Sequence, residues 1–315
     1  MPKARNCVAK RKDMGKKRLI VIGGPTASGK TEAAIAIARH LGAEIIGADA
    51  RQVYAELAIG VGRPSANQMA SANHHLIGHV SIHRHYSVGH YLQDAMPLID
   101  RLFERHDFAI LAGGTGLYIQ AVLHGIDDMP AVPEALIDEW TRIAEDEGLS
   151  RLQAETARLD PDYYAIVDRH NPARLIRAIT VSLHTGRPYS TFRTGGSAAR
   201  TFESILLQAD LPREVLYARI DRRVDNMLQQ GWLDEARRLL PYKELKALRT
   251  VGYPELFEHL EGRTTLNEAT NRIGQATRRY AKRQLTWLRH HGDWNTFDPD
   301  DTDTLIRNVD DLLNA

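Results

Sequence analysis

The sequence predicts an α/β fold, in which helices flank a parallel sheet and an all-helical insertion interrupts the core. Short apolar runs recur at 19–22, 44–48, 108–112 and 204–209, and turns or helical segments follow them. Runs of this length and composition are typical of strands that are buried on both faces of a parallel sheet. Between the third and fourth runs, the stretch 126–200 has helical periodicity and no convincing strand, which predicts the insertion.

A phosphate-binding loop follows the first predicted strand. Glycines let several N–H groups point into one cavity, the helix predicted at 32–40 directs its positive end there, and Lys30 adds a mobile charge. Thr31 can supply a hydroxyl to Mg²⁺. The motif indicates a P-loop NTPase-like core that binds a di- or triphosphate; the alternative is a glycine-rich turn without a ligand. Its residues are Gly24, Pro25, Thr26, Ala27, Ser28, Gly29, Lys30 and Thr31.

Asp49 and Gln52 follow the second predicted strand, and ligands of open parallel sheets bind at the carboxyl ends of the strands. Three roles remain open for Asp49: it binds Mg²⁺ through water, acts as a general base, or caps a helix that starts at Arg51. Gln52 can offer both a donor and an acceptor to a nucleobase edge.

Glycines surround Thr115 at the end of the third predicted strand, in the sequence Gly113-Gly114-Thr115-Gly116. Such a turn lets the backbone approach a ligand closely, with Thr115 able to orient it, although strand-to-helix turns also need glycines for geometry alone. A phosphate-loop nucleotide hydrolase commonly has an Mg²⁺-binding Asp at this strand end. Its absence weakens an ATPase interpretation.

These patterns divide the chain into four parts. Residues 1–18 carry eight Lys and Arg, and we expect a basic flexible tail, with a polyanion-binding arm as the alternative. The core is discontinuous and consists of 19–125 and 201–296, and the insertion is 126–200. An acidic C-terminal segment, 297–315, ends the chain. Besides the helix after the phosphate loop, helices are predicted at 133–147, 149–159, 172–184, 213–230, 233–239, 253–260 and 266–289.

The composition excludes several classes of protein. The chain has 315 residues, 43% of them hydrophobic, which allows two domains or one core with an insertion. A single cysteine, Cys7, excludes a disulfide framework, and no apolar run approaches the ~20 residues that span a bilayer. We expect a cytoplasmic protein with no membrane partner.

The helix predicted at 266–289 is strongly basic outside its apolar face. Such a surface can bind RNA phosphates, each neutralised phosphate adding to a salt-dependent affinity, although basic clusters also serve solubility. The candidate cations on this helix and elsewhere are Arg174, Arg177, Arg219, Arg222, Arg223, Arg249, Arg272, Arg278, Arg279, Lys282, Arg283 and Arg289.

Read together, the motifs resemble those of the tRNA dimethylallyltransferases, also called tRNA isopentenyltransferases. The resemblance runs from about Leu19 to Trp294, and the motif at 277–287 is its most specific part. The matching motifs are GPTASGKT at 24–31, ADARQVY at 48–54, HHLI at 74–77, GGTGLY at 113–118, NPARLIRA at 171–178, TGRP at 185–188, VGY at 251–253 and TRRYAKRQLTW at 277–287.

The resemblance implies transfer of the dimethylallyl group from dimethylallyl diphosphate to N6 of adenosine 37, in tRNAs that read codons beginning with U. It implies that Asp49 is the base, that Thr115 helps to hold the reacting groups and that Arg223 contacts the diphosphate. Mg²⁺ bound at Thr31 would be the cofactor. The implied contacts with the tRNA anticodon stem-loop are Asp49, Ala50, Arg51, Gln52, Ala173, Arg174, Leu175, Ile176, Arg177, Arg249, Thr250, Val251, Gly252, Tyr253 and Pro254.

Four positions depart from the family pattern. Ala50 stands where the family usually has Ser, and Ala173 stands where a larger polar residue is usual. The family usually has a Lys near the position of Arg63, and an Asp at the position of Gly78, directly after HHLI. We expect these departures to affect rate and tRNA choice more than the type of reaction. No obligate protein partner is expected, and we expect a monomer.

Three other functions compete. An adenylate isopentenyltransferase would use the same chemistry on free AMP, but a small acceptor hardly needs the insertion or the basic helix. A phosphate-loop small-molecule kinase is disfavoured by the missing acid after the third strand. The third is an RNA-binding protein that uses a nucleotide only as a switch.

Overall fold

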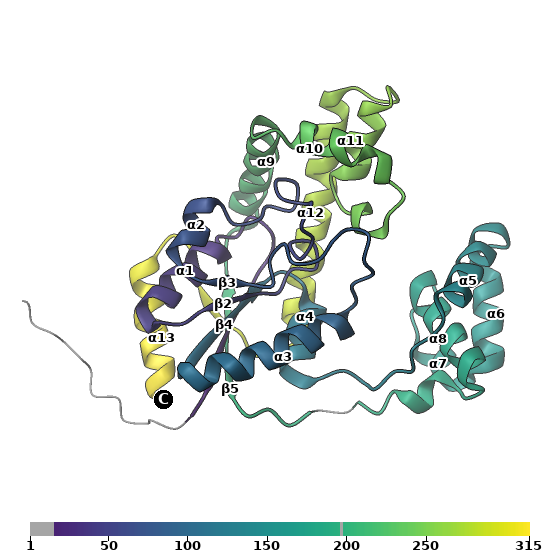
Figure 1. Cartoon of the computed structure of the whole chain (residues 1–315), viewed down its shortest axis with the longest axis horizontal. Helices are drawn as coiled ribbons and strands as arrows, with labels where there is room; N and C mark the ends of the chain where they lie inside the picture. Colours follow the sequence, from purple (N-terminus) through teal and green to yellow (C-terminus); the bar gives the residue numbers. More distant parts are fainter. Residues whose placement is uncertain (1–15, 196–197) are drawn as a thin grey trace, which may run out of the picture. The chain divides into compact units, whose positions relative to one another are not determined.

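A six-stranded sheet, all of whose paired strands are parallel, organises the core, with strand order β3-β2-β4-β1-β5-β6 (Figure 1). The computed structural model describes residues 16–195 and 198–315, so most of the predicted basic tail lies outside the described residues. The strands are β1 Arg18–Gly23, β2 Ile45–Gly47, β3 His74–His75, β4 Phe108–Gly113, β5 Glu203–Ala209 and β6 Asn295–Phe297.

The predicted α/β fold is confirmed, and its four predicted strands are β1, β2, β4 and β5. Sequence patterns missed β3 and β6 because neither His74–His75 nor Asn295–Phe297 forms an apolar run. β3 is the His-His pair of the HHLI motif, with His74 opposite Ile45 of β2. Both missed strands lie at the edges of the sheet.

Alternating side chains of β1 lie in two different hydrophobic cores. Leu19 and Val21 pack in one core with residues of α3, α4, α11 and α12, whereas Ile20 and Ile22 pack in the other with residues of α1 and α13. Burial of each such side chain contributes about 1.5–3 kcal/mol. The helices of this part are α1 Lys30–Leu41, α2 Ala66–Ser71, α3 Val88–Arg105, α4 Gly116–His124, α9 Arg213–Gln229, α10 Trp232–Leu239, α11 Tyr253–Leu260, α12 Leu266–His290 and α13 Thr302–Asn314.

The acidic C-terminal segment is not a separate part, contrary to the prediction for 297–315. It begins at the end of β6 and continues into α13, which lies beside α1 (Figure 1). Leu305 and Val309 are buried in the same core as Ile37 of α1. The many aspartates on the other positions of α13 dominate the composition and obscure this apolar stripe.

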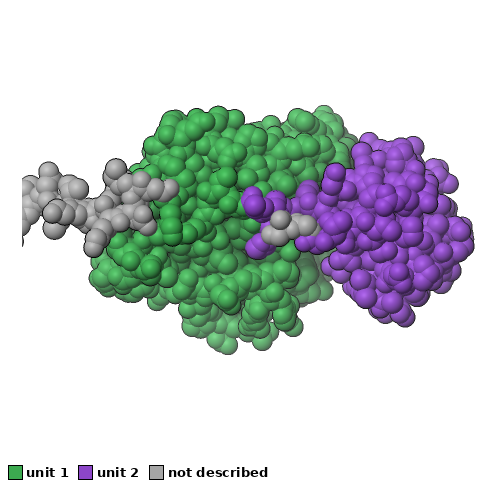
Figure 2. Space-filling view, turned by 90° about the horizontal axis from the view of Figure 1, so that it is seen from below, with its two compact units in different colours: residues 1–123, 200–315 green, residues 124–199 purple. Residues whose placement is uncertain are grey.

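A second compact unit, His124–Ala199, is helical and has its own hydrophobic core (Figure 2). The other unit is formed by the described residues up to Leu123 together with Arg200–Ala315. The sequence placed the insertion at 126–200 and missed one short helix, which Asp160 caps by accepting a hydrogen bond from Tyr163 N. The helices of this unit are α5 Glu134–Asp146, α6 Leu149–Leu159, α7 Pro161–Ile166 and α8 Pro172–Thr185.

No helix in the described part of the chain combines the length and the apolar character that crossing a membrane requires.

Candidate active site

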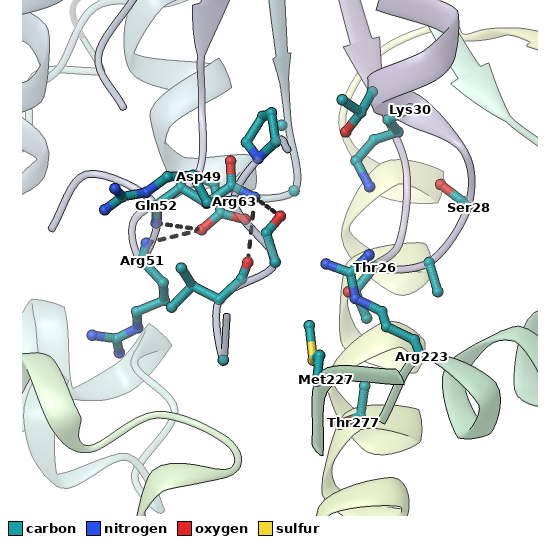
Figure 3. A pocket seen from close by; sticks show the side chains of 18 of the residues that line it. Thr26, Ser28, Lys30, Asp49, Arg51, Gln52, Arg63, Arg223, Met227 and Thr277 are labelled. Carbon is teal, nitrogen blue, oxygen red and sulfur yellow. Dashed lines mark hydrogen bonds between the residues drawn. The ribbon is translucent and has the colours of Figure 1, made fainter. Parts of the chain in front are cut away.

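A cavity of about 1110 Å³ opens at the carboxyl ends of β1, β2 and β4. The phosphate loop, the turn after Asp49 and the glycines before Thr115 line it, as do α9 and α12. In Figure 3, Lys30 and Ser28 lie on one side, Asp49 and Gln52 on the other, and Arg223 enters from α9. The structure therefore brings the three predicted catalytic residues, Asp49, Thr115 and Arg223, into one cavity with the loop.

The phosphate loop is shaped by backbone geometry. Gly29 has a φ of 83°, in the left-handed region, and directly precedes α1, whose free N–H groups face the loop. The residues from Thr26 to Thr31 line the cavity, but Gly24 and Pro25 are buried behind it, so these two shape the loop rather than face a ligand. The Pro25 carbonyl accepts a hydrogen bond from Lys30 Nζ at 2.5 Å.

Ser28 carries a polar atom that has no partner. Its hydroxyl is buried and makes no hydrogen bond within residues 16–195 and 198–315. A buried hydroxyl without a partner costs free energy, so an oxygen ligand in the loop would stabilise it. Together with Lys30, it makes the loop suitable for a phosphate group.

Lys30 and Arg223 supply the positive charge of the cavity. Burial lowers the pKa of Lys30 to about 8, and Asp49 opposes this shift by raising it. Burial also lowers the pKa of Arg223, and Asp49 again opposes the shift. Arg223 lies so close to Gly62 that a Cβ there would be 1.6 Å from its Nη2. Two desolvated cations in one cavity favour binding of an anion.

Asp49 is held by the turn that follows it. Its Oδ1 accepts hydrogen bonds from Arg51 N at 2.8 Å and Gln52 N at 3.3 Å (Figure 3). No helix begins at Arg51, so the capping alternative holds only for a turn. Within the described residues, no group donates a hydrogen bond to Oδ2 of Asp49. One oxygen therefore fixes the carboxylate, and the other remains able to take a proton.

Thr115 fixes the same turn from the β4 side. Its Oγ1 accepts a hydrogen bond from Ala50 N at 2.9 Å, and its N–H donates to Ala48 O at 3.0 Å. Gly113 lies against the same strand end, since a Cβ there would be 2.1 Å from Ala48 O. No side chain fits at position 113, so an Mg²⁺-binding Asp cannot stand there.

Two residues of α12, Gln284 and Tyr280, belong to the site but were predicted only as part of a helix face. Gln284 is buried; its Oε1 accepts from Thr26 N at 2.9 Å, and its Nε2 donates to Gly114 O at 2.9 Å. It thereby ties the phosphate loop to the turn after β4. Burial, with a contribution from the Asp49 charge, raises the pKa of Tyr280, so its phenol stays protonated beside the carboxylate. Both residues lie in the motif at 277–287, but the motif does not indicate that their side chains reach the cavity.

A buried carboxylate supports the wall formed by residues 58–62. Glu235 of α10 accepts hydrogen bonds from the N–H groups of Ala58, Ile59 and Gly60 at 2.9–3.0 Å, and from the Tyr253 hydroxyl at 2.7 Å. Four donors on one buried carboxylate hold this wall against α10.

Two of the four departures from the family pattern are neighbours. Arg63 Nη2 donates to the carbonyl oxygens of Tyr54, Ala55 and Leu57 at 2.6–3.0 Å. A Cβ added at Gly78 would lie 2.9 Å from this guanidinium. Gly78 itself has a φ of 61°, in the left-handed region that favours glycine over aspartate.

The predicted tRNA contacts fall into two groups. Asp49 to Gln52 and Arg249 to Val251 line the cavity, whereas Gly252 to Pro254 do not. Tyr253 is fully buried and bonded to Glu235, so its side chain is structural and not a tRNA contact in this conformation. Ala173 to Arg177 lie on α8 in the helical unit, where Leu175 is fully buried in the core. Sequence reasoning could not separate inward from outward positions within these motifs.

Comparisons with known proteins agree on one family. A family model described as IPP transferase matches residues 52–291. A tRNA dimethylallyltransferase of Christiangramia forsetii is 45% identical over 89% of this chain and 93% of its own length. A tRNA dimethylallyltransferase 1 of Phocaeicola vulgatus is 41% identical over 92% of this chain and 97% of its own.

Solved structures agree as well. A full-length tRNA isopentenylpyrophosphate transferase of Bacillus halodurans is 34% identical, with a TM-score of 0.69, over 95% of this chain and 96% of its own. A eukaryotic dimethylallyltransferase acting on tRNA is 25% identical, with a TM-score of 0.76, over 94% of this chain and 77% of its own.

Proposed function

The chain belongs to the IPP transferase family, and we propose that it transfers the dimethylallyl group from dimethylallyl diphosphate to N6 of adenosine 37 in tRNA. The products are N6-(dimethylallyl)adenosine and diphosphate. One observation supports this most strongly: the anion-binding loop with Lys30, the carboxylate of Asp49 and Arg223 share one cavity. At about 1110 Å³, that cavity exceeds the roughly 1,000 Å³ of large small-molecule sites, which leaves room for a nucleobase beside the donor.

The acceptor side of the reaction depends on Asp49. The exocyclic amine of adenine is a weak nucleophile because its lone pair is delocalised into the ring. As the bond between N6 and C1 of the donor forms, Oδ2 of Asp49 takes the N6 proton. A base placed in this way contributes about 10²–10⁴-fold to the rate. Thr115 keeps the turn that carries the carboxylate in place through Ala50 N, and the protonated phenol of Tyr280 interacts with the carboxylate charge.

The leaving-group side depends on the loop. The bond between C1 and the diphosphate oxygen breaks with its electron pair on the oxygen, so negative charge grows on the diphosphate. The N–H groups at the start of α1, Lys30 and Arg223 face that charge, and they bind it more strongly in the transition state than in the substrate.

Mg²⁺ fits the donor set of this loop. Thr31 and Ser28 offer hydroxyl oxygens, and Mg²⁺ prefers oxygen ligands while keeping waters and substrate phosphates. Thr31 would hold the ion, and diphosphate oxygens and water would complete its shell. When bound, the ion would neutralise charge on the departing diphosphate.

The tRNA anticodon stem-loop would present a base that has left its stack. Extrusion costs a few kcal/mol, which contacts to the flipped base offset. Gln52 and Arg249 lie on the cavity wall, where they can contact the base and the backbone. Nε2 of Gln52 donates to the carbonyl oxygens of Val61 and Gly62 at 3.3 and 3.0 Å, so the predicted donor is already engaged and Oε1 is the atom left for a nucleobase edge. We propose that Arg174 and Arg177 of α8 add contacts to the stem, and that the protein acts in the cytoplasm on tRNAs reading codons that begin with U.

One assay tests the function against its rivals. The purified protein is incubated with Mg²⁺, labelled dimethylallyl diphosphate, ATP, AMP and unmodified tRNA. We expect label in tRNA only, at adenosine 37 after nuclease digestion. Label in AMP would favour an adenylate isopentenyltransferase. Consumption of ATP with unlabelled tRNA would show that the transferase assignment is wrong.

A further inference from the structure

A second arginine, one helical turn before Arg223, faces the phosphate loop. Arg219 and Arg223 are four residues apart on α9 and therefore lie on the same face of that helix. Both line the cavity. A Cβ added at Gly29 would lie 3.8 Å from Nη1 of Arg219, which places this end of the guanidinium beside the loop.

The other end of the Arg219 guanidinium is held by the C-terminal segment. Its Nη2 donates to Asp300 Oδ2 at 2.5 Å, and Asp300 also lines the cavity. The Arg219 side chain is 22% exposed and that of Asp300 66% exposed. Water therefore screens much of the charge of Asp300, and its repulsion of an anion in the loop is weak.

The segment that carries Asp300 is itself well anchored. Asp300 N donates to Asp298 Oδ1 at 2.9 Å, and Asp210 N donates to Phe297 O at 2.9 Å. Pro299 lies against the loop, since a Cβ at Gly29 would be 2.8 Å from its Cβ. Beyond it, Leu305 of α13 is buried in the core. Asp300 is thus a fixed anchor for Arg219, although the sequence places them 81 residues apart.

We propose that Arg219 is a further diphosphate-binding residue and that Asp300, from the acidic C-terminal segment, is its positioning residue. The proposal rests on the proposed function, because it assigns the loop to a diphosphate. A free arginine side chain loses considerable rotamer entropy when it binds a ligand. Because Asp300 holds Nη2, the Arg219 side chain is already ordered in the unliganded protein, and Nη1 lies beside the loop.

The test measures binding of inorganic diphosphate with Mg²⁺ by titration calorimetry, independently of transfer. Arg219→Met should raise the Kd by about tenfold to a hundredfold, as loss of a hydrogen bond to a charged group does. Arg219→Lys keeps the positive charge but not the planar guanidinium, so its Kd should lie between those of the wild-type protein and Arg219→Met. Asp300→Asn should raise the Kd by about two- to fivefold, as expected for an exposed ion pair. In steady-state transfer to tRNA it should raise KM for the donor and leave kcat within about twofold.

The double variant separates positioning from a general structural effect. In the Arg219→Met background, Asp300→Asn should not change the Kd for diphosphate further. In the otherwise wild-type protein, Asp300→Glu keeps a carboxylate and should bind diphosphate more tightly than Asp300→Asn, with most of the wild-type affinity. Arg213→Met is the matched control: Arg213 lies on α9 outside the cavity and stacks on Tyr217. It removes one charge from the same helix and should leave the Kd unchanged. Arg219→Gln serves as a second variant if Arg219→Met lowers the thermal stability.

The outcomes distinguish this proposal from the proposed function. A Kd for Arg219→Met within twofold of the wild-type value, while Lys30→Met weakens binding, would overturn the role of Arg219. An equal effect of Asp300→Asn with and without Arg219 would overturn the positioning role. A wild-type protein that binds no diphosphate would instead contradict the proposed function itself.

Discussion

At the scale of single residues, the Asp49 carboxylate combines a structural and a chemical role. The sequence left capping and general base as competing alternatives. Oδ1 accepts hydrogen bonds from two backbone N–H groups of the following turn, and no described residue donates a hydrogen bond to Oδ2. Capping thus orients the carboxylate on which the proposed chemistry depends.

Because the two oxygens of Asp49 have different roles, Asp49→Asn tests the role of Asp49 as a general base separately from its role in the turn. Asn keeps an Oδ1 acceptor for Arg51 N and Gln52 N, so the turn should persist, but its amide cannot take a proton. We expect kcat for transfer to tRNA to fall by about 10²-fold or more, with the Kd for diphosphate unchanged. Asp49→Ala, which removes the cap as well, is the comparison. Near-normal turnover of the Asn variant would leave Asp49 with the structural role alone.

Lys30 makes donor binding depend on pH. Its pKa of about 8 in the unliganded protein means that the ammonium is present below pH 8 and lost above it. A bound diphosphate favours the charged form, so above pH 8 binding must take up a proton. We expect the Kd for diphosphate to be flat from pH 7 to about 8 and to rise by up to about tenfold per pH unit above it. Calorimetry in buffers of different ionisation enthalpy measures both the Kd and the proton uptake.

Lys30→Arg is the control for that titration, because a guanidinium stays charged over this range and should remove the pH dependence. The same pKa shift also affects the stability of the fold. The folded protein releases the Lys30 proton near pH 8 and the unfolded chain near 10.5, so the free energy of unfolding contributed by this group rises between these values. A Kd that weakens equally in Lys30→Arg would assign the pH effect to another group.

At the scale of elements, helices that follow β5 in the sequence hold the walls of the site together. Gln284 of α12 holds the phosphate loop through Thr26 N, 258 residues away in the sequence, and holds the turn after β4 through Gly114 O. A Cβ at Gly114 would lie 2.2 Å from its Nε2, so glycine is needed there for this contact. The GGTG motif thus serves packing by α12 as well as approach to a ligand.

Glu235 of α10 holds the opposite wall of the cavity through hydrogen bonds, so its removal should lower the free energy of unfolding. Glu235→Ala leaves the N–H groups of Ala58, Ile59 and Gly60 and the Tyr253 hydroxyl without their acceptor. At about 1–3 kcal/mol for each buried unsatisfied group, we expect the free energy of unfolding to fall by roughly 3 kcal/mol or more. Urea unfolding measures it, with an unchanged m value as a check on two-state behaviour.

Asp234→Ala is the matched control for the Glu235 variant. Asp234 precedes Glu235 on α10, and its side chain is 67% exposed and paired with Arg237. Exposed pairs contribute about 0.2–1 kcal/mol, so its removal should cost little. Equal losses in the two variants would show that the hydrogen bonds of Glu235 do not support the wall.

At the scale of the whole molecule, the helical unit can be separated from the sheet without disturbing either core. Its hydrophobic side chains, such as Trp140, Leu152 and Ile179, pack among themselves. Arg200 donates to the carbonyl oxygens of Ala121 and Val122 at 2.7–2.8 Å, so the two chain ends that flank the unit lie close together. A short linker can therefore replace the unit.

We predict that replacing residues 126–199 by a short Gly/Ser linker leaves the Kd for diphosphate within about twofold while transfer to tRNA is lost, because the Arg-bearing α8 is removed. Calorimetry and the label-transfer assay measure the two properties. In the full chain, Arg174→Ala should weaken tRNA binding and reduce its salt dependence by about one phosphate contact. Arg142→Ala on α5 is the control. Unchanged tRNA affinity without the unit would contradict its role.

Features that are local in the chain could be predicted from the sequence alone. The phosphate loop, the apolar strands and Asp49 after β2 could be predicted, because glycine conformation, continuous apolar runs and helix N-termini depend on neighbouring residues. Motif order also identified the family. The short edge strands β3 and β6 carried no such signal, and the aspartates of α13 concealed its apolar stripe.

The side chains that complete the site could be identified only from the packing of the folded chain. Gln284 with Thr26, Glu235 with Gly60 and Arg219 with Asp300 are contacts between residues 258, 175 and 81 positions apart in the sequence. The tertiary structure also separated Tyr253 and Leu175, which are buried, from neighbours in the same motifs that line the cavity or are exposed. The physical reason is that such contacts arise when separate elements pack, and packing fixes distances that no local pattern encodes.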